Sequence, residues 1–214
     1  MLKRATVPLL PVTLIVVSAL VSLSYASDEP THTYSQTATE SWDFAPGGRL
    51  ELHLHAGDLR IVPAIDSRIS IRYTMQSNHA DFIGKVKPEF DVKGPSAVLR
   101  LEAPDNGNID VELQVPAQTD LYVRLGAGDI IVGPIGGNHD VETHAGDIQI
   151  RVPQPLNYGW VDASTHAGNI SAPFGRGKGW IGSSLKYRGQ GKYRVHVHTL
   201  AGDISFQEPE SAQM

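Results

Sequence analysis

The sequence has no cysteine among its 214 residues, which excludes disulfide bonds, thiolate metal sites and a cysteine nucleophile. Helical signals are also missing, because no segment after residue 26 has apolar residues at a convincing helical spacing. The chain contains no Gly-x-Ser-x-Gly elbow, phosphate-binding loop or dinucleotide fingerprint. These absences predict an all-β protein that is not an enzyme and that needs no cofactor.

An excess of basic residues is missing as well. Acidic side chains outnumber basic ones by 23 to 18, and the formal net charge is −5 at pH 7. A mildly acidic chain lacks the basic footprint of a general nucleic-acid binder. We therefore expect no nucleic acid among the partners of this protein.

The first 26 residues have the pattern of a cleaved signal peptide. Lys3 and Arg4 form a basic start, residues 7–21 are mostly apolar, and Ser24-Tyr25-Ala26 places small residues where a signal peptidase cuts. The apolar run is short for a membrane span, and two prolines interrupt it. We expect a bacterial protein that is exported to the periplasm, the cell envelope or the extracellular space. After cleavage it should not be an integral membrane protein.

The composition divides the rest of the chain into three parts. Residues 27–41 are rich in Ser, Thr, Glu and His without apolar periodicity, which predicts a disordered leader. Residues 42–207 carry the apolar patterns of a single domain, and residues 208–214 should form a disordered tail.

A short motif, Ala-Gly-Asp-Ile or a close variant, recurs along this domain. Apolar residues alternate with polar ones on both sides of the Gly-Asp pair, which predicts a half-buried strand before it and another after it. Glycine allows a positive φ, and Asp or Asn can bond to nearby backbone, so the pair suits a tight turn. The alternative is a ladder of carboxylates that binds calcium, but the glycine-rich nonapeptide of such ladders is absent. The copies are residues 56–61, 106–111, 127–132, 145–150, 167–172 and 201–206.

The spacing of the copies predicts how they pack. Counted from Gly107, successive copies follow at intervals of 18 to 22 residues, except for the longer gap before Gly202. A period near 20 residues is the length of one coil of a β-solenoid. We expect a solenoid-like stack continuous with an N-terminal antiparallel sheet, with a β-sandwich as the alternative. The isoleucines after the turns should share one interior, namely Ile130, Ile148, Ile170 and Ile204.

The N-terminal half is less regular. The repeat cannot be traced through residues 62–98, although residues 68–75 alternate as a strand and a second strand is expected around residues 90–92. Residues 98–102 and 109–115 are predicted to pair with each other around the turn at residues 104–107.

A basic segment precedes the last copy of the motif, and it contains no acidic residue. It is either a solvated hairpin whose aromatic residues cap the core, or a patch that binds an anionic envelope glycan or lipid head group. The candidate binding residues are Arg176, Lys178, Trp180, Lys186, Arg188, Lys192 and Arg194.

Histidines suggest a second kind of site. A His-x-His pair on a strand puts both rings on one face, which suits Zn²⁺ or Cu²⁺. If coils stack in chain order, the outward row at the motif runs Gly126, His144, His166, Leu200. The alternative is a row of solvent-exposed polar residues without a metal. The candidate ligands are His53, His55, His144, His166, His196 and His198.

Acidic residues leave one enzymatic alternative open. Asp140, Glu142 and Asp162 should lie on one outward face, where a pair of carboxylates could cleave a glycosidic bond. Exported β-helix enzymes act on polysaccharides, but the analogy of fold is the only support for this reading.

The repeated motif, and residues 141–148 above all, resembles a family of bacterial domains usually described as putative adhesins or as domains of unknown function with toastrack-like β-repeats. The resemblance covers about residues 43–207. It implies an exported or envelope-facing β-repeat protein, and it supplies no catalytic residues. We expect a non-enzymatic binding or scaffolding module of the cell envelope, whose partner is a glycan, an anionic lipid or an envelope protein. The alternatives are an exported polysaccharide-active enzyme and a periplasmic metal-binding protein.

Overall fold

The computed structural model of the protein describes residues 33–104, 108–152, 157–178 and 182–208. The predicted signal peptide, Trp180 and residues 209–214 lie outside them. Apart from one short 3-10 turn, η1 (Ala80–Phe82), the elements within these ranges are strands, so the all-β prediction is confirmed.

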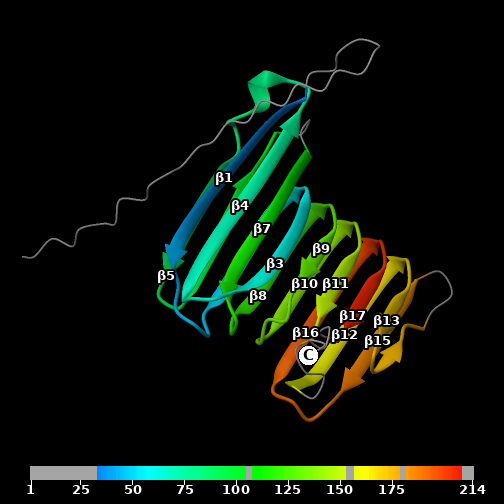
Figure 1. Ribbon diagram of the computed structural model, residues 1–214. Coiled ribbons are helices and arrows are strands. Elements are labelled where there is room, and N and C mark those ends of the chain that lie inside the picture. Colours follow the sequence, from blue (N-terminus) through cyan, green and yellow to red (C-terminus); the bar gives the residue numbers. More distant parts are fainter. Residues whose placement is uncertain (1–32, 105–107, 153–156, 179–181, 209–214) are drawn as a thin grey trace, which may run out of the picture.

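The strands form two mixed sheets that face each other across one hydrophobic core (Figure 1). Neither sheet closes on itself. Sheet A contains, from edge to edge, β1 (Tyr34–Asp43), β4 (Arg68–Ser77), β7 (Asn108–Pro116), β3 (Asp58–Ala64), β9 (Ile130–Val132), β11 (Ile148–Arg151), β17 (Ile204–Gln207), β13 (Ile170–Ala172) and β14 (Gly175–Arg176). Sheet B contains β15 (Ser183–Arg188), β12 (Tyr158–Ala167), β16 (Tyr193–Ala201), β10 (His139–Ala145), β8 (Asp120–Ala127), β2 (Arg49–Ala56), β6 (Ser96–Glu102) and β5 (Lys87–Lys93).

Each copy of the motif carries the chain from sheet B to sheet A. The strand before the Gly-Asp turn lies in sheet B, the strand after it lies in sheet A, and both pair in parallel with their counterparts from other copies. The weak copy follows the same plan, because β6 pairs with β2 while β7 pairs with β3. The prediction that residues 98–102 and 109–115 pair with each other is therefore wrong. Both strands turn an apolar face toward the common core, and they do so from opposite sheets.

The four isoleucines after the turns share one interior, as predicted. Ile148 is in register with Ile130 on one side and with Ile204 on the other, and Ile204 is in register with Ile170. Each is at most 4% exposed. Burial of these side chains removes apolar surface from water, which is the main favourable contribution to folding.

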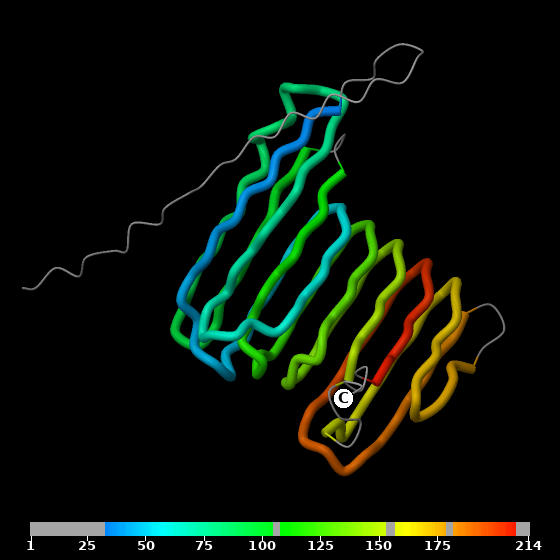
Figure 2. Tube along the Cα trace, in the orientation of Figure 1, coloured from blue at the N-terminus to red at the C-terminus, as the bar shows by residue number. Residues whose placement is uncertain are grey.

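The copies do not stack in chain order. The last copy, β16–β17, lies between β10–β11 and β12–β13. The ribbon in Figure 1 and the Cα tube in Figure 2 both show the red segment, β17, between its neighbours. The predicted outward row is corrected accordingly to Gly126, His144, Leu200, His166. The segment between β13 and β16 leads to the edge strands β14 and β15 first, and this detour leaves the inner place for the final copy.

The turns are joined to one another by their acidic side chains. Asp58, Asp129, Asp147 and Asp203 each accept, at Oδ1, the backbone N–H of the equivalent residue in the next turn of the stack, at 2.7–3.0 Å. Asn169 donates the last of these bonds. The acids were expected to bond within their own turn, and they bond across the stack instead. Each bond satisfies a backbone donor that the turn leaves exposed.

The glycines of the turns allow this close stacking. Gly146 has a φ of 137°, which disfavours other residues. A Cβ atom at Gly146 would overlap the carbonyl of Gly128, and one at Gly202 would overlap the carbonyl of Gly146. The motif therefore needs glycine for its backbone angle and for the approach of the neighbouring turn.

The predicted leader needs a correction. Residues 34–41 lie in β1, which pairs antiparallel with β4 at the edge of sheet A. The sequence of this strand lacks the apolar alternation by which a half-buried strand is recognised, and in the structure only Ala38 of the strand is buried. The expected antiparallel N-terminal part is present, because β1, β4 and β7 pair in this way within sheet A. The strands expected at residues 68–75 and 90–92 are β4 and β5.

Aromatic side chains pack near the two ends of the stack. Trp42 of β1 stacks on Phe90 of β5 with ring centroids 4.4 Å apart, and this pair links the edges of the two sheets. At the other end, the ring centroid of Phe174 lies 4.7 Å from that of Tyr187 and 5.5 Å from that of Phe206. Both groups shield the core where no further strand covers it.

Candidate functional site

The outward side chains of sheet B form a polar face in which parallel strands align equivalent positions. Strands in parallel register place such residues side by side at about the strand spacing of ~4.8 Å. One row across β8, β10, β16 and β12 contains Tyr122, Asp140, His196 and Asp162. The next row contains Arg124, Glu142, His198 and Ser164.

Arg124 is held firmly at the centre of this face. Its Nη2 atom lies 2.9 Å from Asp140 Oδ1 and 3.2 Å from Glu142 Oε1. Its Nη1 atom donates to the backbone carbonyls of Val123 and Asp140, at 2.9 and 3.2 Å. The guanidinium also lies 3.6 Å from the ring centroid of Tyr122. A guanidinium fixed on three sides holds the two carboxylates in place.

His196 completes a group of three metal-binding side chain types. Its Nε2 atom is 3.6 Å from Glu142 Oε1, and one potential ligand atom each from Asp140, Glu142 and His196 lies within 4.8 Å of the others. All three side chains are half-buried. Imidazole nitrogen and carboxylate oxygen together suit a divalent transition metal.

The other predicted histidines have different neighbours. His53 Nε2 is 2.6 Å from Glu51 Oε1, and this hydrogen bond lowers the pKa of Glu51. His198 Nδ1 is 2.9 Å from the Ser164 hydroxyl, and its ring lies 5.5 Å from that of His166. His144 and His166 are separated by β16, so the expected histidine row is interrupted.

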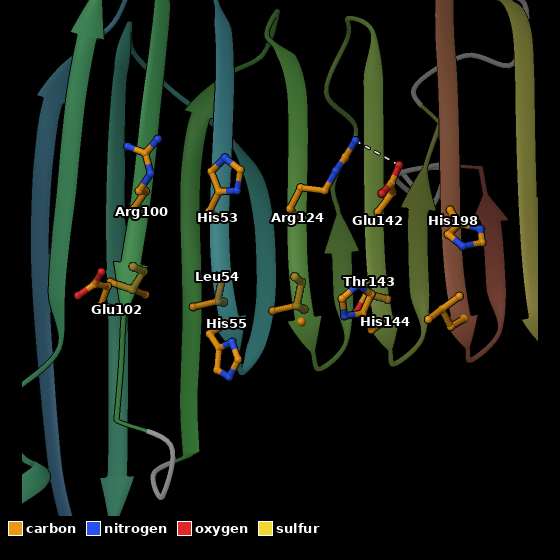
Figure 3. A pocket seen from close by; sticks show the side chains of 14 residues that line it. His53, Leu54, His55, Arg100, Glu102, Arg124, Glu142, Thr143, His144 and His198 are labelled. Carbon is orange, nitrogen blue, oxygen red and sulfur yellow. Dashed lines mark ion pairs between the residues drawn. The ribbon is translucent and has the colours of Figure 1, made fainter.

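A shallow depression of about 500 Å³ lies at Gly126, which the strand registers place between His55 and His144. Figure 3 shows these two histidines. Glycine has no side chain, and the flanking imidazoles form the walls of this depression. Figure 3 shows His53, Arg124, Glu142 and His198 along its upper border, with the ion pair between Arg124 and Glu142. The three acids expected outward do lie on this face, but two of them are tied to Arg124 and Asp162 lies 3.9 Å from Lys186.

The predicted basic patch is divided between the two sheets. Arg176 lies on β14 at the edge of sheet A, and Lys178 forms an isolated bridge with Ser184. The other described members gather around the end of sheet B: Lys186 and Arg188 on β15, Lys192 before β16, and Arg194 on β16.

A groove of about 480 Å³ lies between these members of the patch. Trp160, Arg188, Lys192, Tyr193 and Arg194 line it together with three glycines. The ammonium of Lys192 is 4.7 Å from the centroid of the Tyr193 ring. Among the ion pairs of the described residues, none involves Arg188, Lys192 or Arg194. The groove thus combines unneutralised cations with two aromatic rings.

A second depression of about 510 Å³ shares Trp160 and Arg194 with this groove. It extends across sheet B to Arg49 and Tyr122, and the Arg49 guanidinium is 5.3 Å from the Tyr122 ring centroid. The groove and this second depression together form a polar trough that crosses the strands. Sequence reasoning missed Trp160, Arg124 and Arg49, because no local pattern shows which strands become neighbours.

One histidine lies in the core rather than on this face. His139 is 2% exposed, and burial lowers its pKa to about 4. Its ring centroid is 6.4 Å from that of Tyr158, whose pKa is raised by burial. Within the described ranges, neither the His139 ring nor the Tyr158 hydroxyl makes a hydrogen bond of good geometry. His139 is therefore a structural residue that remains neutral at ordinary pH.

No helix in the described part of the chain is long and apolar enough to cross a membrane. The sequence matches no protein-family model and no curated protein.

Solved structures give the comparison that sequence does not. A putative cell adhesion protein from Clostridium sporogenes aligns with 81% of this chain and 100% of its own, with 16% identity and a TM-score of 0.51. A putative adhesin from Bacteroides fragilis aligns over 79% and 96%, with 9% identity and a TM-score of 0.25. A putative adhesin from Parabacteroides merdae aligns over 81% and 96%, with 9% identity and a TM-score of 0.26. The chain thus has the fold of the Clostridium protein, as the resemblance of its repeats to adhesin-like domains implied.

Proposed function

We propose that this protein is an exported, non-enzymatic binding module of the bacterial cell envelope, and that it binds an anionic glycan. The repeat units would form a short solenoid-like stack that presents the ligand-binding face of sheet B. The observation that carries the proposal is the groove lined by Trp160, Arg188, Lys192, Tyr193 and Arg194. The signal-peptide pattern of residues 1–26 and the adhesion-related name of the Clostridium protein support the location.

The chemistry of the groove suits an acidic sugar polymer. Cations without a carboxylate partner keep their full attraction for a carboxylate, sulfate or phosphate on the ligand. Aromatic rings provide flat apolar surface against which a sugar ring can pack. The groove adjoins the second depression, which is lined by Arg49 and Tyr122 but also by Asp120 and Asp140. The anionic groups of the glycan are therefore expected in the groove, whose described lining residues include no carboxylate.

The alternative of a polysaccharide-cleaving enzyme has less support. Asp140 and Glu142 both contact the same Arg124 guanidinium, at 2.9 and 3.2 Å. A glycosidase instead places its two carboxyl groups on opposite sides of the glycosidic bond. Release of reducing ends from an anionic polysaccharide by the purified protein would favour the enzyme.

The test is binding to immobilised polygalacturonate, sulfated glycans and vesicles with anionic lipid. We expect the protein to bind an anionic glycan and to lose at least about tenfold in affinity when Arg188, Lys192 and Arg194 are changed to serine. Binding should weaken as salt rises from about 50 to 300 mM, because screening shortens the reach of surface charges.

A matched variant controls for net charge. Arg72, Lys85 and Lys87 are exposed basic residues in the N-terminal half of the chain, and their change to serine removes the same charge. This variant should bind like the unchanged protein. Equal losses in both triple variants, or binding to vesicles alone, would overturn the proposal.

A further inference from the structure

We propose that Asp140, Glu142 and His196 bind a divalent transition metal of the Zn²⁺ class. This site lies beside the basic groove and does not depend on it.

The fold brings the three side chains together by register. Asp140 and Glu142 are two residues apart on β10, so both side chains leave the same face of the strand. β16 lies next to β10 in parallel, and its register places His196 directly beside Asp140. The resulting ligand atoms lie within 4.8 Å of one another, and a small further approach would bring them around one ion.

Arg124 must be reconciled with a cation at this place. Arg124 Nη2 approaches one oxygen of each carboxylate, Asp140 Oδ1 and Glu142 Oε1. A carboxylate has about four lone-pair sites, so acceptor capacity remains for an ion on both residues. The two carboxylates and one guanidinium leave a net charge of −1, which still attracts a cation. Ligating carboxylates are commonly oriented by neighbouring hydrogen-bonding groups, and Arg124 contacts both carboxylates of this site.

One carboxylate oxygen at the site has unused acceptor capacity. Asp140 Oδ1 is buried and makes no hydrogen bond of good geometry among the described residues, although Arg124 lies near it. Buried carboxylate oxygens normally have such a partner. Asp162 also lies beside His196 in the β12–β16 register, and its carboxylate is 3.9 Å from the Lys186 ammonium.

The donor set favours Zn²⁺ over calcium or magnesium. Calcium and magnesium prefer sites made entirely of oxygen, whereas zinc accepts imidazole nitrogen together with carboxylate oxygen. Three protein ligands leave at least one position of a tetrahedral ion open. Asp140 and His196 both line the second depression, so that position would face the polar trough of sheet B.

The experiment is isothermal titration of metal-free full chain with ZnCl₂ alone. We expect one Zn²⁺ per chain, and at least about tenfold weaker binding in the isosteric variant Glu142→Gln and in His196→Ala. His53→Ala is the matched control, because His53 is equally exposed on the same face and pairs with Glu51 instead. This control should leave Zn²⁺ binding within about twofold of the unchanged protein.

Circular dichroism would first establish that each variant is folded, and His196→Gln replaces His196→Ala if the latter is not. Absence of Zn²⁺ binding by the unchanged protein would overturn the proposal. An equal loss in His53→Ala, or no loss in Glu142→Gln, would overturn it as well. The glycan proposal would remain intact in each case, because its test uses different residues and a different ligand.

Discussion

Single residues with dual roles explain why the Gly-Asp motif recurs. The glycine permits a positive φ and lets the next turn approach, while the acid accepts a backbone N–H from that next turn. Asn169 closes the series, since its own N–H donates to Asp203 and the copies of the motif end there. An amide in place of a carboxylate is consistent with that terminal position. The motif therefore encodes contacts between copies as well as the turn within a copy.

Asp147 tests this account at the level of one hydrogen bond. Its Oδ1 atom accepts the N–H of Asp203 at 2.7 Å. We expect Asp147→Ala to lower the free energy of unfolding by about 1–2 kcal/mol, because the N–H of Asp203 loses its partner. Asp147→Asn keeps an acceptor and should stay within about 0.5 kcal/mol of the unchanged protein. Urea unfolding measures both, and equal effects of the two changes would contradict the account.

His139 should make the fold sensitive to acid. Its pKa is about 4 in the folded protein, below the usual value of about 6.5 in an unfolded chain. As pH falls from about 6.5 to 4, His139 is protonated in the unfolded chain but stays neutral in the folded protein. The free energy of unfolding therefore decreases. The loss attributable to His139 is roughly 3 kcal/mol between pH 6.5 and 4.

The measurement is urea unfolding at several pH values, with a metal chelator present throughout. His139→Leu should flatten the decline of unfolding free energy between pH 6.5 and 4. His144→Leu changes an exposed histidine and should leave the decline as it is. If His139→Leu shows the same decline as the unchanged protein, the buried neutral histidine is not its cause.

Whole elements show what the sequence could and could not predict. The alternation around each turn, the period near 20 residues and the shared isoleucine interior could be predicted, because each depends on residues close together in the chain. The place of β16–β17 between β10–β11 and β12–β13 could not, since equivalent copies offer equally good apolar edges. β1 was missed because pairing with β4, rather than apolar periodicity, holds it in place.

The site depends on the same element order. Asp140 and Glu142 were predicted on an outward face, and His196 was named as a candidate metal ligand, but their contact exists only because β16 lies next to β10. Arg124 could not be singled out, because a lone arginine on a strand carries no local signal. The sequence therefore predicts which types of residue form the candidate site, but it does not predict which of them come into contact.

The stack predicts that an inner copy depends on both of its neighbours. Ile148 is 1% exposed between Ile130 and Ile204. We expect Ile148→Ala to destabilise the fold by about 2–5 kcal/mol through lost burial and the cavity left behind. Ile65 is fully exposed, and Ile65→Ala should change the unfolding free energy by less than about 0.5 kcal/mol. Similar costs in thermal or urea unfolding would contradict the shared interior.

At the scale of the whole molecule, the candidate sites gather on the outer face of sheet B. The outer face of sheet B bears the polar trough, the candidate metal ligands and the basic groove, and it crosses strands from most copies of the repeat. A surface built from repeated units is extended, which suits a polymer better than a compact small molecule. The proposed binding on this face would therefore depend on stacking of the copies rather than on any single copy.

The most direct test of this account is NMR chemical-shift mapping of the full chain during titration with polygalacturonate. The account predicts shifts of the Trp160 indole signal and of the amides of Arg188, Lys192 and Arg194, while the Trp42 indole at the opposite end stays unchanged. Shifts confined to other surfaces, or no shifts at any concentration of the polymer, would contradict it.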